Sequence, residues 1–471
     1  MSTRNTMLAV AVLATLSACA VAPPPKSEDI RPQAMPNVAT PGQWSVEGAA
    51  AGPVAGTWLA TFGDARLQAL VTEALAYNPD LRVAATRVEV ASEYANLADS
   101  TLWPQVDLLA RGGGEMSGDS SGLEGVGLFA NWELDLWGRV RSARAGSVAG
   151  YESVVADAEY ARQSVAALVA KSYFLAVEAG LQLRLAEQTV AASDQLAALA
   201  EQRQRIGKGD GYDAALARAN AETFRDTVEQ FKLAREQSLR ALEALVGRYP
   251  GADVDVATEL AQTPGPVPAG LPSELLERRP DVVAAERRIA AAFYGVQEAK
   301  AARLPRISLT ASVNDISSEL FVLKNRDNPV WSVGASLLQP VFYGGALQTQ
   351  VRIRTAEQKQ AVAEYGRIGA RAFGEVEDAL SAEFAARRRE TVLGRGFAEN
   401  ENALKLAQVR QDVGSGDLRG VRQQQLAVYG SSATLVRVRT EQLVQRVNLY
   451  LALGGGFEAA PATAPVAQAK E

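Results

Sequence analysis

Four short segments of the chain alternate apolar and polar residues with a period of two. They are residues 106–111, 126–136, 306–314 and 331–337. This alternation is typical of β-strands with one apolar face, and each segment is about as long as a tilted strand that crosses a bilayer. A soluble antiparallel sheet with one buried face would show the same pattern. Tryptophans near the ends of the segments favour the membrane, because indole rings concentrate at membrane interfaces.

Long helical segments separate the two pairs of predicted strands, and they limit how a sheet could close. Four strands joined by so much helix cannot form a soluble sandwich. Four strands cannot close a membrane barrel either, and open strand edges are not tolerated in lipid. Several copies of the chain must therefore share one barrel, and three copies would give twelve strands, enough for a pore.

Two long segments without proline predict helices that pair with shorter return helices. The first covers residues 138–206 and returns over 212–246; the second covers 345–413 and returns to Leu453. At about 1.5 Å per residue, each long helix would reach on the order of 100 Å. Helices of this length need packing partners, so we expect coiled-coil hairpins.

The chain is a tandem repeat of one unit. Asn78-Pro79-Asp80-Leu81 matches Arg279-Pro280-Asp281-Val282, and Trp103-Pro104 matches Leu304-Pro305, both 201 positions later. We therefore expect a first structural repeat at residues 58–249 and a second at 271–456, joined by a Pro/Gly-rich linker at 250–270.

Each repeat is expected to begin with a helix that leads into its first strand. In the first repeat this helix covers roughly residues 66–102 and is broken at Asn78-Pro79. In the second repeat, residues 271–304 predict one helix that begins at Pro272-Ser273 and ends at Leu304-Pro305.

The N-terminal segment has the features of an export signal. Residues 1–18 combine a basic start, a short apolar core and a small-residue ending, which predicts a signal peptide. The ending Leu16-Ser17-Ala18-Cys19 resembles a bacterial lipoprotein box, which would make Cys19 the lipidated N-terminus. An ordinary secretory signal with a chance cysteine is the alternative. Residues 19–57 are rich in proline and predict an extended tether without helix, and residues 457–471 predict a disordered tail.

Composition argues against several functional classes. The chain has 48 Lys+Arg and 54 Asp+Glu residues, a formal net charge of −6, so it has no basic footprint for nucleic acid. It has no histidine, which removes imidazole bases and His metal ligands. We expect neither an enzyme nor a protein with a metal or cofactor.

Several motifs together resemble one family. These are LPSELLERRPDVVAAE from Leu271, NWELDLWGRVR from Asn131, LLQPVFYGG from Leu337 and NLYLALGGGF from Asn448. They resemble the outer membrane factor family of TolC/OprM type, in particular its NodT-like lipoprotein branch. The resemblance implies a homotrimeric channel-tunnel, mainly α with membrane β, in which a twelve-stranded barrel continues into a barrel of helical hairpins. It also implies partners, namely a periplasmic adaptor (membrane fusion) protein and an inner membrane transporter, in the efflux of small molecules or drugs.

The resemblance assigns functional roles to the hairpin turns, which would be the periplasmic tips where the adaptor docks and the pore closes. The candidate tip and gate residues are Gly207, Gly209, Asp210, Gly414, Gly416, Asp417 and Gln423. Gln423 stands where the family commonly has an aspartate, which puts a carboxylate ring there in doubt. Asp417 and Asp412 are weaker substitutes, because a turn aspartate more often serves local hydrogen bonds.

Glu133 and Asp135 are two residues apart on a predicted strand and would share one face. With no acid–base partner in the sequence, we expect both to line the lumen of the pore rather than to form a catalytic pair.

Two alternatives to an efflux channel remain open at this stage. One is an outer membrane duct for type I protein secretion, which the sequence does not separate from drug efflux. The other is a lipid-anchored periplasmic coiled-coil scaffold with soluble β-hairpins. The expected location is the outer membrane of a Gram-negative bacterium, with the helices extending into the periplasm.

Overall fold

The computed structural model describes residues 22–39, 41–46, 56–111, 124–265, 267–270, 272–317 and 330–456. The predicted signal peptide, Cys19 and the tail 457–471 lie outside the described residues, as do the connections between the strands of each pair.

The order of elements confirms the tandem repeat. Each repeat has two short helices, two strands, a helix of 67 residues and a return helix of 35 residues. The first repeat contains α3 (Ala65–Tyr77), α4 (Pro79–Ser100), β1 (Gln105–Arg111), β2 (Glu124–Leu134), α5 (Arg139–Arg205) and α6 (Gly211–Leu245). The second contains α7 (Pro272–Arg278), α8 (Pro280–Ala301), β3 (Arg306–Ser317), β4 (Val330–Leu338), α9 (Ala346–Asp412) and α10 (Leu418–Ala452). The elements α2 (Ser27–Ala34) and η1 (Trp58–Phe62, a 3-10 helix) precede them.

The chain divides into two compact units that do not follow the repeat boundaries. The first, which we call the strand unit, comprises the described residues of 22–38, 86–157 and 281–369. The second, the helical unit, comprises the described residues of 39–85, 158–280 and 370–456.

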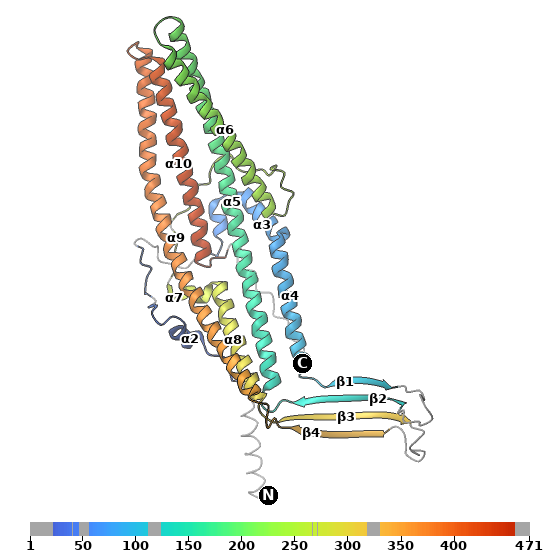
Figure 1. The fold of residues 1–471 in the computed structure, drawn as a ribbon. Helices are drawn as coiled ribbons and strands as arrows, with labels where there is room; N and C mark the ends of the chain where they lie inside the picture. Colours follow the sequence, from blue (N-terminus) through green and yellow to red (C-terminus); the bar gives the residue numbers. More distant parts are fainter. Residues whose placement is uncertain are drawn as a thin grey trace. The chain divides into compact units, whose positions relative to one another are not determined.

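The strand unit contains one antiparallel sheet in the order β1-β2-β3-β4 (Figure 1). The pair β2–β3 joins the two repeats, with Leu128 opposite Val313 and Leu134 opposite Ile307. All four predicted strands are confirmed. However, β2 ends at Leu134, so the prediction that Asp135 lies on the strand is wrong.

The expectation that residues 19–57 contain no helix is also wrong. Ser27–Ala34 forms α2 in spite of Pro32, and it buries Ile30, which is 3% exposed. The end of α2 packs directly on α9, because a Cβ added to Gly366 would lie 2.1 Å from the carbonyl oxygen of Ala34. The apolar burial compensates for the one helical hydrogen bond that a proline cannot donate.

The helix predicted over residues 271–304 is two helices. It breaks before Pro280, as the first repeat breaks before Pro79. In both repeats the residue before the proline binds the end of the return helix: Asn78 Nδ2 donates to the carbonyl of Leu245 (2.8 Å) and Arg279 Nη1 to that of Ala452 (3.1 Å). The residue before a proline disfavours helical geometry, so the first helix ends there. The side chain at this break then binds the end of the return helix.

The core of the helical unit joins the start of the first repeat to the end of the second. The indole of Trp58 stacks on Tyr450, with ring centroids 5.4 Å apart, and Phe62 packs on Phe174 at 5.1 Å. Charged residues are also buried here. Arg446 is fully buried and forms an ion pair with Glu383, which also accepts a hydrogen bond from Arg387 (2.8 Å).

Candidate functional site

One face of the sheet is apolar and exposed. The exposed fraction reaches 76% for Trp331 and 89% for Val333, and no described part of the chain covers this face. Its large side chains include Val106, Leu108, Val126, Leu128, Leu309, Trp331, Val333 and Leu337. A contiguous exposed apolar surface marks contact with lipid or with another protein.

The opposite face carries mostly small and polar residues, although Leu109, Phe129 and Leu338 on it are also exposed, and within the described residues the sheet has two open edges. Ser312 Oγ and Ser332 Oγ, for example, are hydrogen-bonded at 2.7 Å across β3 and β4. In the order β1-β2-β3-β4, each outer strand pairs on one side only. Open edges need partners, above all in lipid, where no water can satisfy their backbone groups.

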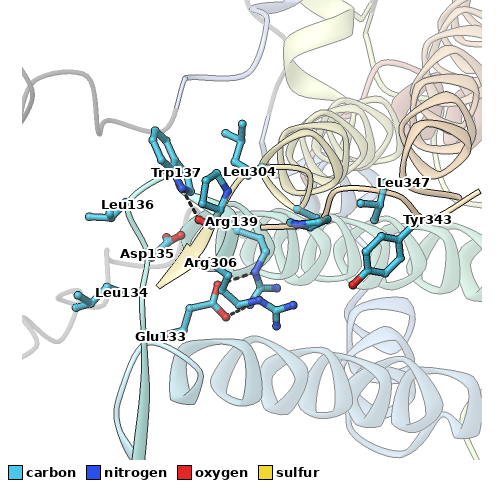
Figure 2. A pocket seen from close by; sticks show the side chains of 14 residues that line it. Glu133, Leu134, Asp135, Leu136, Trp137, Arg139, Leu304, Arg306, Tyr343 and Leu347 are labelled. Atoms are coloured by element: carbon cyan, nitrogen blue, oxygen red, sulfur yellow. Dashed lines mark hydrogen bonds and ion pairs between the residues drawn. The ribbon is translucent and has the colours of Figure 1, made fainter. Parts of the chain in front are cut away.

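The elbow between β2 and α5 holds Glu133 and Asp135 in two arginine networks, and Figure 2 shows the one between Glu133 and Arg139. The carboxylate of Glu133 accepts two hydrogen bonds from Arg139, from Nε at 2.9 Å and from Nη2 at 2.7 Å. This bond to Glu133 raises the pKa of the Arg139 guanidinium, although burial acts in the opposite direction. The bidentate pair fixes the first residue of α5 to the end of β2.

Asp135 caps α5. Its carboxylate accepts hydrogen bonds from the backbone N–H of Val140 (3.1 Å) and Arg141 (2.8 Å) and forms an ion pair with the Arg141 side chain (3.1 Å). The first N–H groups of a helix have no partner within the helix, so Asp135 satisfies two of them. Glu133 and Asp135 therefore brace the elbow, and neither is available for acid–base chemistry.

Two tryptophans of the same elbow bind the segments that lead into the strands. Trp132 Nε1 donates to the carbonyl of Leu102 (2.8 Å), and Trp137 Nε1 donates to that of Pro305 (2.7 Å). Beside them lies a pocket of about 170 Å³. It is lined by residues that include Glu133, Arg139, Leu304, Arg306 and Tyr343 (Figure 2).

The predicted tips are the two turns of the helical hairpins. Gly207 (φ 74°) and Gly414 (φ 73°) end α5 and α9 in the left-handed conformation that favours glycine. Asp210 and Asp417 begin the return helices as caps, accepting hydrogen bonds from the backbone N–H of Asp213 (2.8 Å) and Gly420 (2.9 Å). The local hydrogen-bonding role expected for a turn aspartate is therefore present.

Within these turns, the backbone at Gly209 and at Gly416 lies very close to the last turn of the preceding long helix, which favours a residue without a side chain. A Cβ added to Gly209 would lie 3.2 Å from the Cβ of Arg203, and one added to Gly416 would lie 3.0 Å from that of Arg410. Both distances are tighter than nine in ten Cβ contacts in proteins.

Two ion pairs connect the tips to each other. Arg203 Nη1 of α5 lies 3.3 Å from Asp417 Oδ2, and Arg419 Nη1 of α10 lies 3.9 Å from Asp213 Oδ2 of α6. We call these the tip ion pairs. Gln423 lies next to them and lines the same groove as Arg203, Asp213 and Arg419. Asp412 is exposed and takes no part in either pair.

The structure thus links Asp417, through Arg203, to the groove that Gln423 lines, and it brings Glu133 and Asp135 together at the elbow. Sequence reasoning missed their basic partners, among them Arg203, Arg419 and Arg139. Arg139 and Arg141 lie one and three residues after Gly138, where α5 begins, and the Glu-x-Asp-x₃-Arg-x-Arg spacing could have indicated them. The tip ion pairs connect residues more than 200 positions apart, which the sequence pattern does not show.

Comparison with known proteins places the chain in a family. The outer membrane efflux protein family matches residues 70–248 and 271–455. Outer membrane protein OprJ of Pseudomonas aeruginosa is 32% identical, with 96% of this chain and 95% of OprJ covered. The cation efflux system protein CusC of Escherichia coli is 30% identical, with 96% and 99% covered.

Solved structures agree with the sequence relatives. The open state of the MtrE outer membrane channel of Neisseria gonorrhoeae superposes with a TM-score of 0.78 at 29% identity, covering 90% of this chain and 96% of MtrE. The outer-membrane channel OprN gives a TM-score of 0.76 at 27% identity, covering 90% and 99%. These relatives are channels and transport proteins rather than enzymes. The predicted TolC-like fold is confirmed, and the chain belongs to the outer membrane efflux protein family.

Proposed function

We propose that this protein is the outer membrane channel of a tripartite efflux pump and works as a homotrimer. The observation that carries the proposal is the four-stranded sheet, with an exposed apolar face and two open edges. A single chain cannot satisfy these edges in lipid, whereas three chains of four strands would close a barrel with the apolar face toward the lipid. The protein does no chemistry, and the partner transporter supplies the energy.

The helical tips are the proposed site of docking and gating. The groove beside the tip ion pairs has a volume of about 370 Å³. Its apolar lining includes Leu196, Leu199, Leu216, Phe224 and Leu426. An apolar groove with charged margins suits one face of an amphipathic helix, so we assign it to a helix of the periplasmic adaptor.

The tip ion pairs hold the two hairpins of one chain against each other. We propose that adaptor binding separates them, with the turn at Gly414 moving outward. Gln423 lines the adjoining groove and carries no charge, so we assign the carboxylates of Asp417 and Asp213 to the gate.

In the strand unit, we assign Glu133 and Asp135 to the lumen side of the elbow. Glu133 lies on the same side of β2 as Asn131, away from the apolar face. Because both carboxylates are paired with arginine, their contribution to the lumen is a neutralised surface rather than a free negative charge.

The proposed anchor is an acylated Cys19, which would hold the chain at the outer membrane of a Gram-negative bacterium. Several acyl chains hold a protein firmly at a membrane, whereas one is marginal. Relatives of this chain also include a solvent efflux pump outer membrane protein and an antibiotic efflux pump outer membrane protein of Pseudomonas putida, 32% and 30% identical, which supports efflux over protein secretion.

The test is a transport assay in a Gram-negative strain that lacks its own outer membrane channels but carries a matching adaptor and transporter. Expression of this chain should lower the accumulation of a fluorescent pump substrate, and only when all three components are present. The same strain with a type I secretion system is the comparison. Secretion of its protein substrate without any effect on dye accumulation would refute the efflux assignment.

A further inference from the structure

The face of the sheet that carries Ser312 and Ser332, which we call the polar face, lines the lumen in the proposed homotrimer. Three large apolar side chains interrupt it: Leu109 is 54% exposed, Phe129 37% and Leu338 52%. Leu338 stands by itself next to Arg306, its partner across β3 and β4. Leu109 and Phe129 lie together on the other side of the sheet, on β1 and β2.

Leu109 and Phe129 form one small apolar patch. Leu109 lies opposite Gly127, and Phe129 is two residues beyond Gly127 on the same face of β2. Such diagonal neighbours are about 7–8 Å apart, which is within reach of aromatic and long side chains. Because Gly127 has no side chain, no side chain of β2 stands between the two apolar groups. Ser312, which lies opposite Phe129 on β3, bounds the patch with a small residue.

A carboxylate lies beside this patch. Asp107 is directly opposite Phe129, a position in which the Cβ atoms of the two residues are about 4.5–5.5 Å apart. Asp107 is exposed, and within the described residues it forms no ion pair and no side-chain hydrogen bond. In contrast to Glu133, which is paired with Arg139, Asp107 therefore keeps its full negative charge.

Basic residues on the polar face of the described strands are too distant to neutralise Asp107. Arg111 is four residues away on β1, or about 13 Å along the strand. Arg306 is six residues along β3 from Ser312, the residue level with Asp107, or about 20 Å. Both separations exceed the Debye length of about 8 Å at physiological salt. The polar face of β4, the other outer strand, adds no charge, because it carries Ser332, Gly334, Ser336 and Leu338.

The chemistry of these three side chains selects a ligand. An exposed carboxylate attracts a cation, and the face of a phenylalanine ring attracts it as well. The patch itself favours an apolar group. We infer that Asp107, Leu109 and Phe129 form a subsite in the lumen for an organic cation that carries an aromatic ring. The inference rests on the proposed channel and adds a class of cargo to it.

The subsite should bind weakly, as a conduit requires. Conduction needs sites that a solute enters readily and also leaves. A cation–π contact at an exposed position corresponds to about a 2- to 5-fold change in affinity. An exposed charge pair corresponds to about 1.4- to 5-fold.

Saturation-transfer NMR of the purified full-length protein in a non-ionic detergent tests the subsite, because this method detects weak binding. The probe is benzyltrimethylammonium, whose charge does not depend on pH, and titration gives its dissociation constant. Phe129→Leu should weaken binding by about 2- to 5-fold, since leucine keeps an apolar contact but has no aromatic face. Asp107→Asn should weaken it by about 1.4- to 5-fold.

The matched control is Leu338→Ala. Leu338 is an exposed apolar residue of the same face, but its cross-strand neighbour is Arg306, so its loss should leave binding of the probe unchanged. Benzenesulfonate carries a ring with the opposite charge. It should bind the wild type more weakly than the cation does, and Asp107→Asn should reduce this difference.

Two results would overturn the subsite: equal binding of the two probes by the wild type, or equal effects of Asp107→Asn and Leu338→Ala. An unheated gel of the same samples separates this inference from the proposed function. A trimer that gives either result would leave the channel standing without the subsite. A single chain on the gel would remove the lumen and overturn both.

Discussion

Removing the tip ion pairs should make the channel open more readily. Arg203 and Asp417 have side chains 42% and 58% exposed, and Arg419 and Asp213 are similarly exposed. Exposed ion pairs contribute about 0.2–1 kcal/mol each. If both pairs exist only in the closed state, each loss would raise the ratio of open to closed tips by about 1.4- to 5-fold. The double variant Arg203→Ala/Arg419→Ala should then raise it by about 2- to 30-fold.

The assay is single-channel recording of the purified protein in a planar bilayer. The double variant should spend more time in a high-conductance state than the wild type, and raising the salt concentration should reduce the difference. Screening causes this reduction, because the Debye length falls from about 10 Å at 0.1 M salt to about 3 Å at 1 M.

The matched control is Arg218→Ala. Arg218 forms an exposed ion pair with Glu201 at 3.1 Å near the same tip, but this pair joins α5 and α6 of one hairpin. It should therefore leave the open fraction unchanged. Equal effects of the Arg218 variant and the double variant would refute the argument that contacts between the hairpins hold the tips closed.

Three further substitutions test the bracing of the fold. Glu383→Gln leaves the fully buried Arg446 without its anion, which should destabilise the protein by about 3–5 kcal/mol and lower the temperature at which the oligomer dissociates on a gel. Asp135→Asn weakens the charge-assisted bonds at the start of α5, worth about 1.5–3 kcal/mol, and should speed hydrogen exchange in the first turn of that helix. Gly414→Ala places a side chain at a left-handed φ of 73°, which should cost about 1–2 kcal/mol in thermal denaturation, whereas Gly430→Ala, in mid-helix with open space around it, should be neutral or stabilising.

These substitutions have controls in the same elements. Glu390→Gln removes the partner of Arg439 in an ion pair whose side chains are 30% and 51% exposed, so its cost should stay near or below about 1 kcal/mol. A cost for Glu383→Gln as small as that of Glu390→Gln would contradict the buried ion pair. Unchanged exchange at the start of α5 in Asp135→Asn would show that the cap contributes nothing there.

The sequence predicts the elements of this protein well because local signals mark their ends. The long helices end at Gly207 and Gly414, since glycine reaches the left-handed conformation without steric cost. The strands are marked by strict alternation, and the repeat lets each half support the other. Pro280 separates α7 from α8 as Pro79 separates α3 from α4. Because the two prolines occupy matching positions of the repeat, the break at Pro79 also indicates the break at Pro280.

Other features depend on tertiary contacts that a sequence pattern does not contain. Pro32 argues against a helix in the tether, yet burial of Ile30 and Met35 stabilises α2. Glu133 and Asp135 are two residues apart and were expected to share a strand face. The strand ends at Leu134, and Asp135 caps the helix instead. Along β2 the alternation of apolar and polar residues continues beyond Leu134, the last residue that pairs with β3. The pattern therefore does not show where the strand ends.

The most direct test of the channel is fractionation of bacterial membranes followed by a gel with and without heating, for the wild type and Cys19→Ser. The account predicts that the wild type is found in the outer membrane fraction and migrates as an oligomer of three chains that heating converts to one. Cys19→Ser should lose acylation and leave the strands able to assemble. A soluble or inner-membrane protein that migrates as one chain without heating would contradict the channel and favour a lipid-anchored periplasmic scaffold.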